Sequence, residues 1–174
     1  MRKILIVVDM QKDFIDGSLG TSEAEAVVDR VIAKIKAYPA EDVYATRDTH
    51  PENYLETQEG RHLPVPHCVA GTPGWQLHPE IEGLVPADHV IDKPTFGSLN
   101  LMNAMVVARA QGEIEIELVG LCTDICVVSN ALLIKAALPE TPIAVDARCC
   151  AGVTPVKHEA ALETMASCQI DIRR

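Results

Sequence analysis

The chain has 174 residues, of which 48% are hydrophobic and 23% are charged, and its formal net charge at pH 7 is −10. This length and composition are ordinary for a globular protein, so we expect one domain that covers residues 1–174. The acidic balance and the small aromatic content of 3% argue against nucleic acid as a partner, because such binding needs clustered cations and stacking surfaces.

The first predicted element is a strand at residues 4–8, where five apolar residues follow one another before Asp9. A continuous apolar run is typical of a strand buried on both faces of a parallel sheet. The run is too short for a secretory signal or for a membrane span, so we expect a cytoplasmic protein with no membrane partner. In that compartment the six cysteines are expected to be reduced.

Strands and helices alternate along the rest of the chain. Apolar runs predict further strands at residues 43–46, 90–91, 115–121 and 143–145, and helical periodicity predicts helices at residues 22–37, 99–110, 125–137 and 155–167. Thr21 or Ser22 ahead of Glu25 resembles the capping box of a helix start. This order predicts an α/β fold with a mostly parallel open sheet of about five or six strands and helices on both faces.

Chemistry-bearing residues follow the predicted strands, where open α/β folds bind ligands. These positions are Asp9, Asp48 with His50, Lys93 and the segment from Cys122 to Cys126, and Asp146 is expected to follow the last strand. A carboxylate can accept the proton of a thiol, a lysine can keep both groups ionised, and a helix N-terminus can hold an oxyanion. Asp9, Lys93 and Cys126 therefore predict an acyl-transfer site.

Cys126 opens a predicted helix, and the dipole of a helix N-terminus is expected to lower the pKa of its thiol. Each of the three residues can also be explained by a purely structural role. Asp9 could cap a turn, Lys93 could be the solvated end of a strand, and Cys126 could fill space, because free cysteines are often buried.

A second cluster lies in the long segment between the strands at 43–46 and 90–91, and long ordered loops are often functional. Its members combine imidazole and carboxylate groups that suit zinc, iron or manganese: Asp48, His50, Glu59, His62, His67 and His78. Taken singly, each histidine is equally explained as a hydrogen-bonding loop residue.

Five segments resemble the isochorismatase-like cysteine hydrolases, in order and over essentially the whole chain. They are VVDMQKDF at 7–14, ATRDTHP at 45–51, PHCVAGTPG at 66–74, DKPTF at 92–96 and GLCTDICV at 120–127. Within this superfamily the second and third segments are similar to those of the nicotinamidases, which hydrolyse nicotinamide to nicotinate and ammonia. Isochorismatase proper lacks the nucleophilic cysteine, so Cys126 speaks against that reaction.

The resemblance implies catalytic roles for residues of these segments. Cys126 aligns with the nucleophile, Asp9 with the group that accepts and donates the proton, and Lys93 with the third member of the triad. It also implies a cis peptide bond before Cys122, whose N–H group forms the oxyanion hole together with that of Cys126.

The resemblance further implies a divalent metal cofactor, with zinc expected first and iron or manganese as alternatives. Asp48, His50 and His67 align with metal ligands. Tyr54 stands where relatives usually carry another histidine, so Glu59 is the expected fourth ligand and His62 its alternative. In this class the metal positions the pyridine ring of the substrate and does not generate the nucleophile.

One departure concerns the aromatic residue that usually precedes the Pro-His pair and packs on the substrate ring. Here the run from His62 to His67 offers only Leu63 or Val65. Three other apolar positions match residues that line the pocket in relatives, so a flat heteroaromatic amide can still be sandwiched: Phe14, Leu19 and Phe96.

The sequence thus predicts a hydrolase of small amides that serves NAD salvage and forms a homo-oligomer, as relatives often do. One alternative is a related amidohydrolase acting on a carbamoyl or ureido substrate, since such enzymes share the triad but generally not the metal loop. A second is a non-catalytic thiol or metal sensor, for which the adjacent Cys149 and Cys150, with Cys168, would supply redox chemistry.

Overall fold

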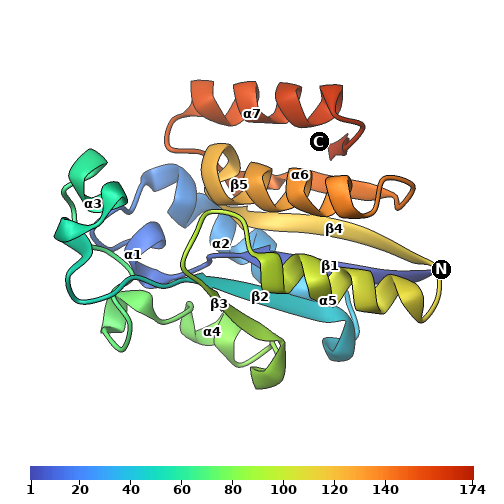
Figure 1. Ribbon diagram of the computed structural model, residues 1–174, viewed down its shortest axis with the longest axis horizontal. Coiled ribbons are helices and arrows are strands. Elements are labelled where there is room, and N and C mark those ends of the chain that lie inside the picture. Colours follow the sequence, from blue (N-terminus) through green and yellow to red (C-terminus); the bar gives the residue numbers. More distant parts are fainter.

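The computed structural model describes residues 1–174 and contains one six-stranded sheet in the order β3-β2-β1-β4-β5-β6. Its strands are β1 Arg2–Val8, β2 Val43–Asp48, β3 Val90–Lys93, β4 Ile114–Leu121, β5 Ile143–Ala151 and β6 Asp171–Arg173. All five strand pairs are parallel. The predicted α/β class, with a parallel open sheet, is therefore confirmed (Figure 1).

Four long helices connect the strands, close to the predicted ranges: α2 Ser22–Lys36, α5 Leu99–Ala110, α6 Val128–Ala137 and α7 Pro155–Ser167. The side chain of Thr21 accepts a hydrogen bond from the backbone N–H of Ala24 at 3.1 Å, so Thr21 caps α2. Three short helices were not predicted: α1 Lys12–Ile15, α3 Gln58–His62 and α4 Pro79–Glu82. Helices of four or five residues are too short to show a periodic apolar pattern.

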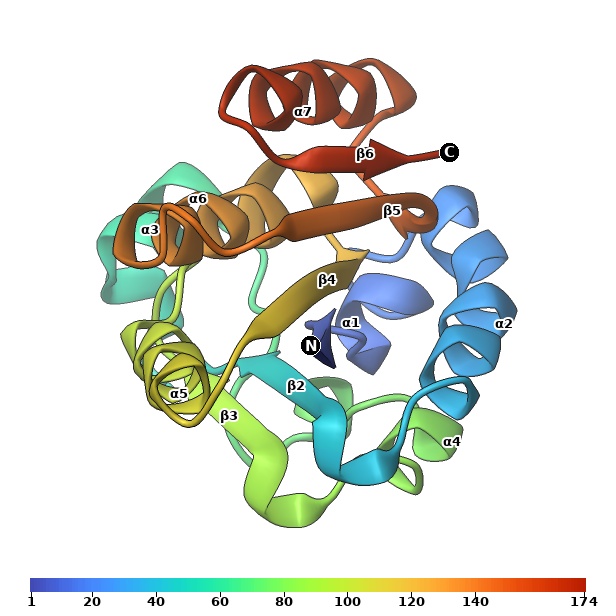
Figure 2. The same cartoon turned by 90° about the vertical axis from the view of Figure 1, so that its right-hand side faces the viewer.

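The helices cover both faces of the sheet. Leu5 and Val7 point into a core shared with α1, α2 and α4, whereas Ile4, Ile6 and Val8 point into a second core shared with α5, α6 and α7. Figure 2 looks along the strands and shows α2 and α4 on one side of the twisted sheet and α5 and α6 on the other. Burial on both faces explains the uninterrupted apolar run of β1.

Two predictions about the last part of the chain are wrong. The strand expected at 143–145 continues to Ala151, so Asp146 lies inside β5 and not beyond its end. Its buried carboxylate is 2.7 Å from the Lys34 ammonium, and this ion pair lets a charged residue occupy the middle of a strand. The short strand β6 was also missed, because Asp171 and Arg173 give it no apolar pattern.

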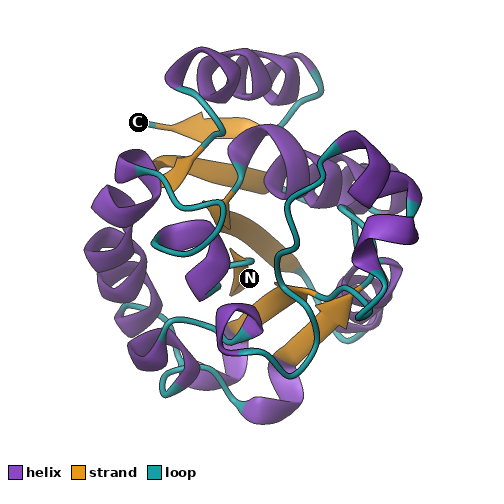
Figure 3. Cartoon of the chain, turned by 90° about the vertical axis from the view of Figure 1, so that its left-hand side faces the viewer, coloured by secondary structure: helices purple, strands orange, loops and turns teal.

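The carboxyl ends of the strands lie at one edge of the sheet, where loops and short helices cross over them (Figure 3). The chain leaves β4 through a π-helical turn, Thr123–Val127, and α6 begins only at Val128, three residues later than predicted. None of the helices has the length and apolar character needed to cross a membrane.

Candidate active site

Asp9, Lys93 and Cys126 meet at this edge. Asp9 directly follows β1, Lys93 is the last residue of β3, and Cys126 lies in the π-helical turn after β4. The Lys93 ammonium is 2.7 Å from Asp9 Oδ2 and donates a hydrogen bond to Cys126 Sγ at 3.3 Å. Asp9 and Lys93 are fully buried and Cys126 is 4% exposed. The structure thus brings together the three residues that strand-end positions had singled out.

The two oxygens of the Asp9 carboxylate have different partners. Its backbone φ is +47°, a left-handed conformation that Asp tolerates better than most residues. The Thr46 hydroxyl, from β2, donates a hydrogen bond to Asp9 Oδ1 at 2.6 Å. Asp9 Oδ2 accepts no well-aligned hydrogen bond, so it retains a lone pair that can accept a proton. Thr46 was not predicted as a functional residue, because its role depends on the register of β1 and β2.

Charge and burial shift the ionisation of all three groups. Burial raises the pKa of Asp9. Burial, followed by the negative charge of Asp9, raises the pKa of the Cys126 thiol well above its usual value. Burial opposes the charge on Lys93, but Asp9, Cys126 and Asp48 outweigh it and raise the pKa of the lysine. The expectation of a lowered thiol pKa is therefore wrong, because burial and the charge of Asp9 raise it.

The turn that carries Cys126 is fixed from several directions. The peptide bond between Leu121 and Cys122 is cis, in line with the family resemblance. Gly120, with φ of +115°, passes so close to β1 that a Cβ atom there would lie 2.1 Å from the Val8 carbonyl oxygen. Only glycine fits this position.

Asn130 ties this turn to the loop after β3. Its side-chain amide donates hydrogen bonds to the Cys126 carbonyl at 2.8 Å and to the Phe96 carbonyl at 3.1 Å, and its oxygen accepts one from the Ser98 N–H at 2.8 Å. Sequence reasoning missed Asn130. The available signal was an asparagine four residues after Cys126, at a spacing that places it on the otherwise apolar, buried face of the helix.

A group of four possible metal ligands lies beside the triad: Asp48, His50, Glu59 and His67, with ligand atoms all within 4.8 Å of one another. His50 Nε2 is 2.9 Å from Asp48 Oδ2 and 3.6 Å from Glu59 Oε1. His67 Nε2 is 3.7 Å from each of the same two oxygens. A tetrahedral ion with bonds of about 2.1 Å holds its ligands roughly 3.4 Å apart, so this group has the dimensions of a zinc-sized site.

Surrounding contacts orient these four side chains. His67 Nδ1 lies 2.8 Å from the Val65 carbonyl, which leaves Nε2 free to bind a cation. Gln11 brackets Asp48 by donating to its carbonyl at 2.8 Å and accepting from its N–H at 2.7 Å. Tyr54 packs edge-on against both imidazoles. The sequence did not predict this role of Gln11.

Two of the histidines considered for this group lie elsewhere. His62 is exposed on α3, with Nδ1 2.9 Å from the Gln58 carbonyl. His78 precedes the first residue of α4. Neither belongs to the group of four, so Glu59 and not His62 completes it.

Asp48 belongs to both parts of the site. Its Oδ1 is 3.4 Å from the Lys93 ammonium, while its Oδ2 faces the histidines. Burial would raise the pKa of Asp48, but the hydrogen bond from His50 and the charge of Lys93 outweigh it and lower the pKa. Asp48 is therefore ionised, as a metal ligand must be.

A cavity of about 40 Å³ connects the triad with this group, and Cys126, Asp48, Glu59 and His67 all line it. Its apolar wall includes the three predicted substrate contacts, Phe14, Leu19 and Phe96. Of the two residues considered in place of the missing aromatic one, Leu63 lines the cavity and Val65 does not. The apolar part of the wall can therefore pack against a flat ring.

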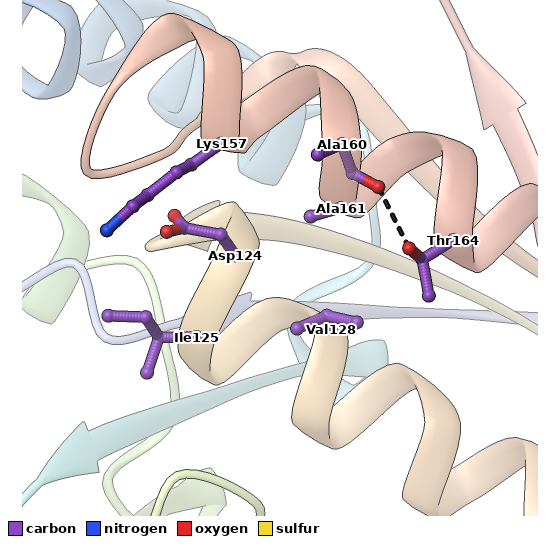
Figure 4. Close-up of a pocket in the computed structure, with 7 residues that line it drawn as sticks. All are labelled: Asp124, Ile125, Val128, Lys157, Ala160, Ala161 and Thr164. Carbon is purple, nitrogen blue, oxygen red and sulfur yellow. Dashed lines mark hydrogen bonds between the residues drawn. The ribbon is translucent and has the colours of Figure 1, made fainter.

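A larger hollow of about 520 Å³ lies between the turn at Thr123–Val127 and α7 (Figure 4). Its only charged lining residues are Asp124 and Lys157. Asp124 Oδ1 accepts a hydrogen bond from the Val153 N–H at 2.9 Å, so this carboxylate anchors the loop after β5. No cysteine or histidine lines the hollow, and the candidate active site remains the smaller cavity.

Comparison with known proteins matches residues 3–173 to the isochorismatase domain. A nicotinamidase/pyrazinamidase of Mycobacterium tuberculosis is 29% identical, with 98% of this chain and 97% of that protein covered. The crystal structure of a Pyrococcus horikoshii pyrazinamidase in complex with zinc is similar, with a TM-score of 0.81, 29% identity and coverage of 100% and 99%. A Bacillus subtilis nicotinamidase/pyrazinamidase also has a TM-score of 0.81, at 26% identity and full coverage of both chains.

Proposed function

The chain belongs to the isochorismatase family, and from this premise we propose that it hydrolyses nicotinamide to nicotinate and ammonia. The observation that carries the proposal is one cavity lined both by Cys126 and by three of the four grouped metal ligands, Asp48, Glu59 and His67. The similarity to proteins named nicotinamidase and pyrazinamidase supports the choice of substrate.

The first half of the proposed reaction forms a thioester. Asp9 takes the thiol proton of Cys126 through Oδ2, and the sulfur attacks the carboxamide carbon. The backbone N–H groups of Cys122 and Cys126 hold the developing oxyanion. Asp9 then gives the proton to the departing nitrogen, and ammonia leaves.

The second half releases the acid. Asp9 accepts a proton from water, the resulting nucleophile attacks the thioester carbon, and the C–S bond breaks. Nicotinate leaves, and the proton on Asp9 returns to the sulfur. Throughout both halves, Lys93 compensates the buried negative charge that alternates between Asp9 Oδ2, at 2.7 Å, and Cys126 Sγ, at 3.3 Å.

We assign a divalent metal, zinc first among the candidates, to Asp48, His50, Glu59 and His67. Two imidazole nitrogens and two carboxylate oxygens fit such an ion, with nitrogen–oxygen distances between 2.9 and 3.7 Å and all four atoms within 4.8 Å of one another. When bound, the metal supplies a Lewis-acidic site for the ring nitrogen of the substrate. Phe14 and Leu63 then flank the ring, so that its carboxamide is directed towards Cys126.

The competing function is hydrolysis of a carbamoyl or ureido substrate by the same cysteine. It is less favoured because that reaction has no use for a ring-binding metal, while the four grouped ligands are buried or half-buried beside the nucleophile. A non-catalytic sensor is disfavoured by Asp9 and Lys93, since sensing by a thiol does not need a proton acceptor and a fixed cation.

Ammonia release tests the proposal. We would incubate the wild-type protein with nicotinamide, pyrazinamide, an N-carbamoyl amino acid and a ureido acid. Release from the pyridine and pyrazine amides is the expected result. Release from the carbamoyl or ureido compounds alone would support the competing function. No release from any of the four compounds would favour the non-catalytic sensor.

Three wider expectations remain proposals. Nicotinate produced by this reaction feeds NAD salvage, we expect the protein to act in the cytoplasm, and we expect it to form a homo-oligomer. Sedimentation of the purified protein measures the last of these directly, because a single chain has a mass of 18.9 kDa.

A further inference from the structure

A second cavity adjoins the site cavity on the side away from the metal-ligand group. It has a volume of about 140 Å³, and nine of its eleven lining residues are hydrophobic. Five residues line both cavities: Phe14, Leu19, Leu63, Cys122 and Ile125. The remaining wall is formed by Thr21, Ala24, Leu121, Ala151, Gly152 and Val153. We call this second space the side cavity.

The site cavity by itself is small. Its volume of about 40 Å³ is less than a third of the 140 Å³ of the side cavity. A substrate whose carboxamide lies against Cys126 has two neighbouring spaces into which a ring substituent can extend. One neighbour is a polar surface hollow that shares Glu59 and Phe96 with the site cavity. The other is the side cavity, which can receive the inner end of the substrate.

The sheet order separates the side cavity from the metal ligands. Asp48 and His50 come from the end of β2, whereas Leu121 and Ala151 are the last residues of β4 and β5. β1 lies between β2 and β4, and none of the four grouped ligands lines the side cavity, so the ligands and the side cavity adjoin different parts of the site-cavity wall. A ring whose nitrogen faces the ligands thus turns its opposite edge towards the side cavity.

Ring geometry identifies the position on that edge. In a pyridine-3-carboxamide, the nitrogen and carbon 5 are both meta to the carboxamide and lie on opposite sides of its axis. We propose that this chain accepts pyridine-3-carboxamides that carry a small apolar substituent at carbon 5, which the side cavity receives. The inference rests on the proposed function, because it takes the ring orientation from the metal-ligand group and the nucleophile.

The walls of the side cavity define the chemistry of the substituent. The only hydroxyl that lines it, that of Thr21, already accepts the hydrogen bond that caps α2. A charged substituent would lose its hydration and gain at most the hydroxyl of Thr21 as a partner, which is costly. A methyl group gains from burial, by roughly fourfold in kcat/KM. An alkyl group therefore favours binding and a carboxylate opposes it.

The test compares kcat/KM for nicotinamide with the values for its 5-methyl, 6-methyl and 5-carboxy derivatives. Wild type is expected to use the 5-methyl compound about fourfold better than the 6-methyl compound, and to use the 5-carboxy compound poorly. Two variants fill the side cavity from different elements, Ala24→Met on α2 and Ala151→Val on β5. Each should lower the ratio of 5-methyl to unsubstituted kcat/KM at least threefold.

Ala26→Met is the matched control, because Ala26 is exposed on the same helix and lines neither cavity. It should leave the ratio unchanged. Preference for the 6-methyl compound, or a ratio that neither filling variant changes, would overturn the inference while leaving nicotinamide hydrolysis intact. Hydrolysis of the 5-methyl compound without hydrolysis of nicotinamide would support the inference and correct the proposed function, and inactivity towards the whole series would overturn both.

Discussion

Two lysines in this molecule, the buried Lys93 and the half-buried Lys34, have almost the same ion-pair geometry and different surroundings. The ammonium of Lys93 is 2.7 Å from Asp9 and 3.4 Å from a second carboxylate. The ammonium of Lys34 is 2.7 Å from Asp146 and 3.3 Å from a second carboxylate. The first group lies at the ends of the strands beside a thiol, whereas the second lies in the middle of β5 beneath α2.

Hydrogen bonding distinguishes the two carboxylates. Both oxygens of Asp146 accept well-formed bonds from Arg148, at 2.9 to 3.1 Å, in addition to the ion pair with Lys34. Burial would raise the pKa of Asp146, but these partners outweigh it and lower the pKa to about 2. Asp9 has one oxygen without an aligned donor, and burial raises its pKa. A carboxylate whose oxygens all accept hydrogen bonds stabilises the fold. A carboxylate with one oxygen free of hydrogen bonds, next to a thiol, can transfer a proton.

Exchange of each lysine for methionine gives the largest contrast between the two groups. Lys93→Met should lower kcat/KM by about a thousandfold, because Asp9 and Cys126 lose the cation that compensates their negative charge. Lys34→Met should keep kcat/KM within about twofold but lower the free energy of unfolding by about 3 kcal/mol. Ammonia release and urea denaturation measure the two effects. Equal losses of activity in both variants would contradict the distinction.

The metal-ligand group should respond in a third way. His67→Ala removes one ligand and no member of the triad, so bound metal should fall and KM for nicotinamide should rise at least tenfold. The effect on kcat should be smaller than the effect on KM, because the metal positions the ring. Metal analysis together with steady-state kinetics provides the measurement, and a loss confined to kcat would assign the metal a part in the chemical step.

A smaller effect is expected from the hydroxyl that donates a hydrogen bond to Asp9 Oδ1. Thr46→Val removes the 2.6 Å hydrogen bond to Asp9 Oδ1 while preserving the shape of the residue. The loss of a hydrogen bond to a charged group, worth about 1.5 kcal/mol, corresponds to roughly a tenfold decrease in kcat/KM. Thr49→Val is a suitable control, since the Thr49 hydroxyl bonds to a backbone carbonyl and the Trp75 ring and not to the triad.

The smallest effect concerns acid stability. The lowered pKa of Asp146 means that its stabilising contribution is present above the unfolded-state pKa of about 3.9 and is lost as the pH falls towards 2. Asp146→Asn cannot titrate there, so its free energy of unfolding should decrease less between pH 5 and pH 2 than that of wild type. Denaturant unfolding at several pH values compares them. Parallel pH profiles would show that Asp146 does not contribute this dependence.

The sequence predicted the reactive lysine group better than the structural one, for a physical reason. Asp9, Lys93 and Cys126 each follow or end a strand, and parallel strands bring such positions to one edge whatever the details of packing. Asp146 was assigned to the same edge, because a charge after three apolar residues indicates the end of a strand. Lys34, on a distant helix, and Arg148 together make that charge compatible with the interior of β5.

Other features depend on contacts that no local pattern reveals. Asp171, Ile172 and Arg173 form β6 because they pair with β5. Three residues are too few for their sequence to indicate a strand. Asn130 and Gln11 act on backbone groups of distant loops. Even the direction of the Cys126 pKa shift follows from full burial beside Asp9, whereas helix position alone predicts the opposite.

The most direct test of the account is the rate of ammonia release from nicotinamide by Cys126→Ala, measured beside wild type with metal content and circular dichroism recorded for both. The account predicts that turnover disappears while the fold and the metal content stay unchanged, because alanine removes only the sulfur that attacks the amide. Retained turnover in a folded, metal-loaded Cys126→Ala protein would contradict the account, since the reaction would then proceed without the thioester.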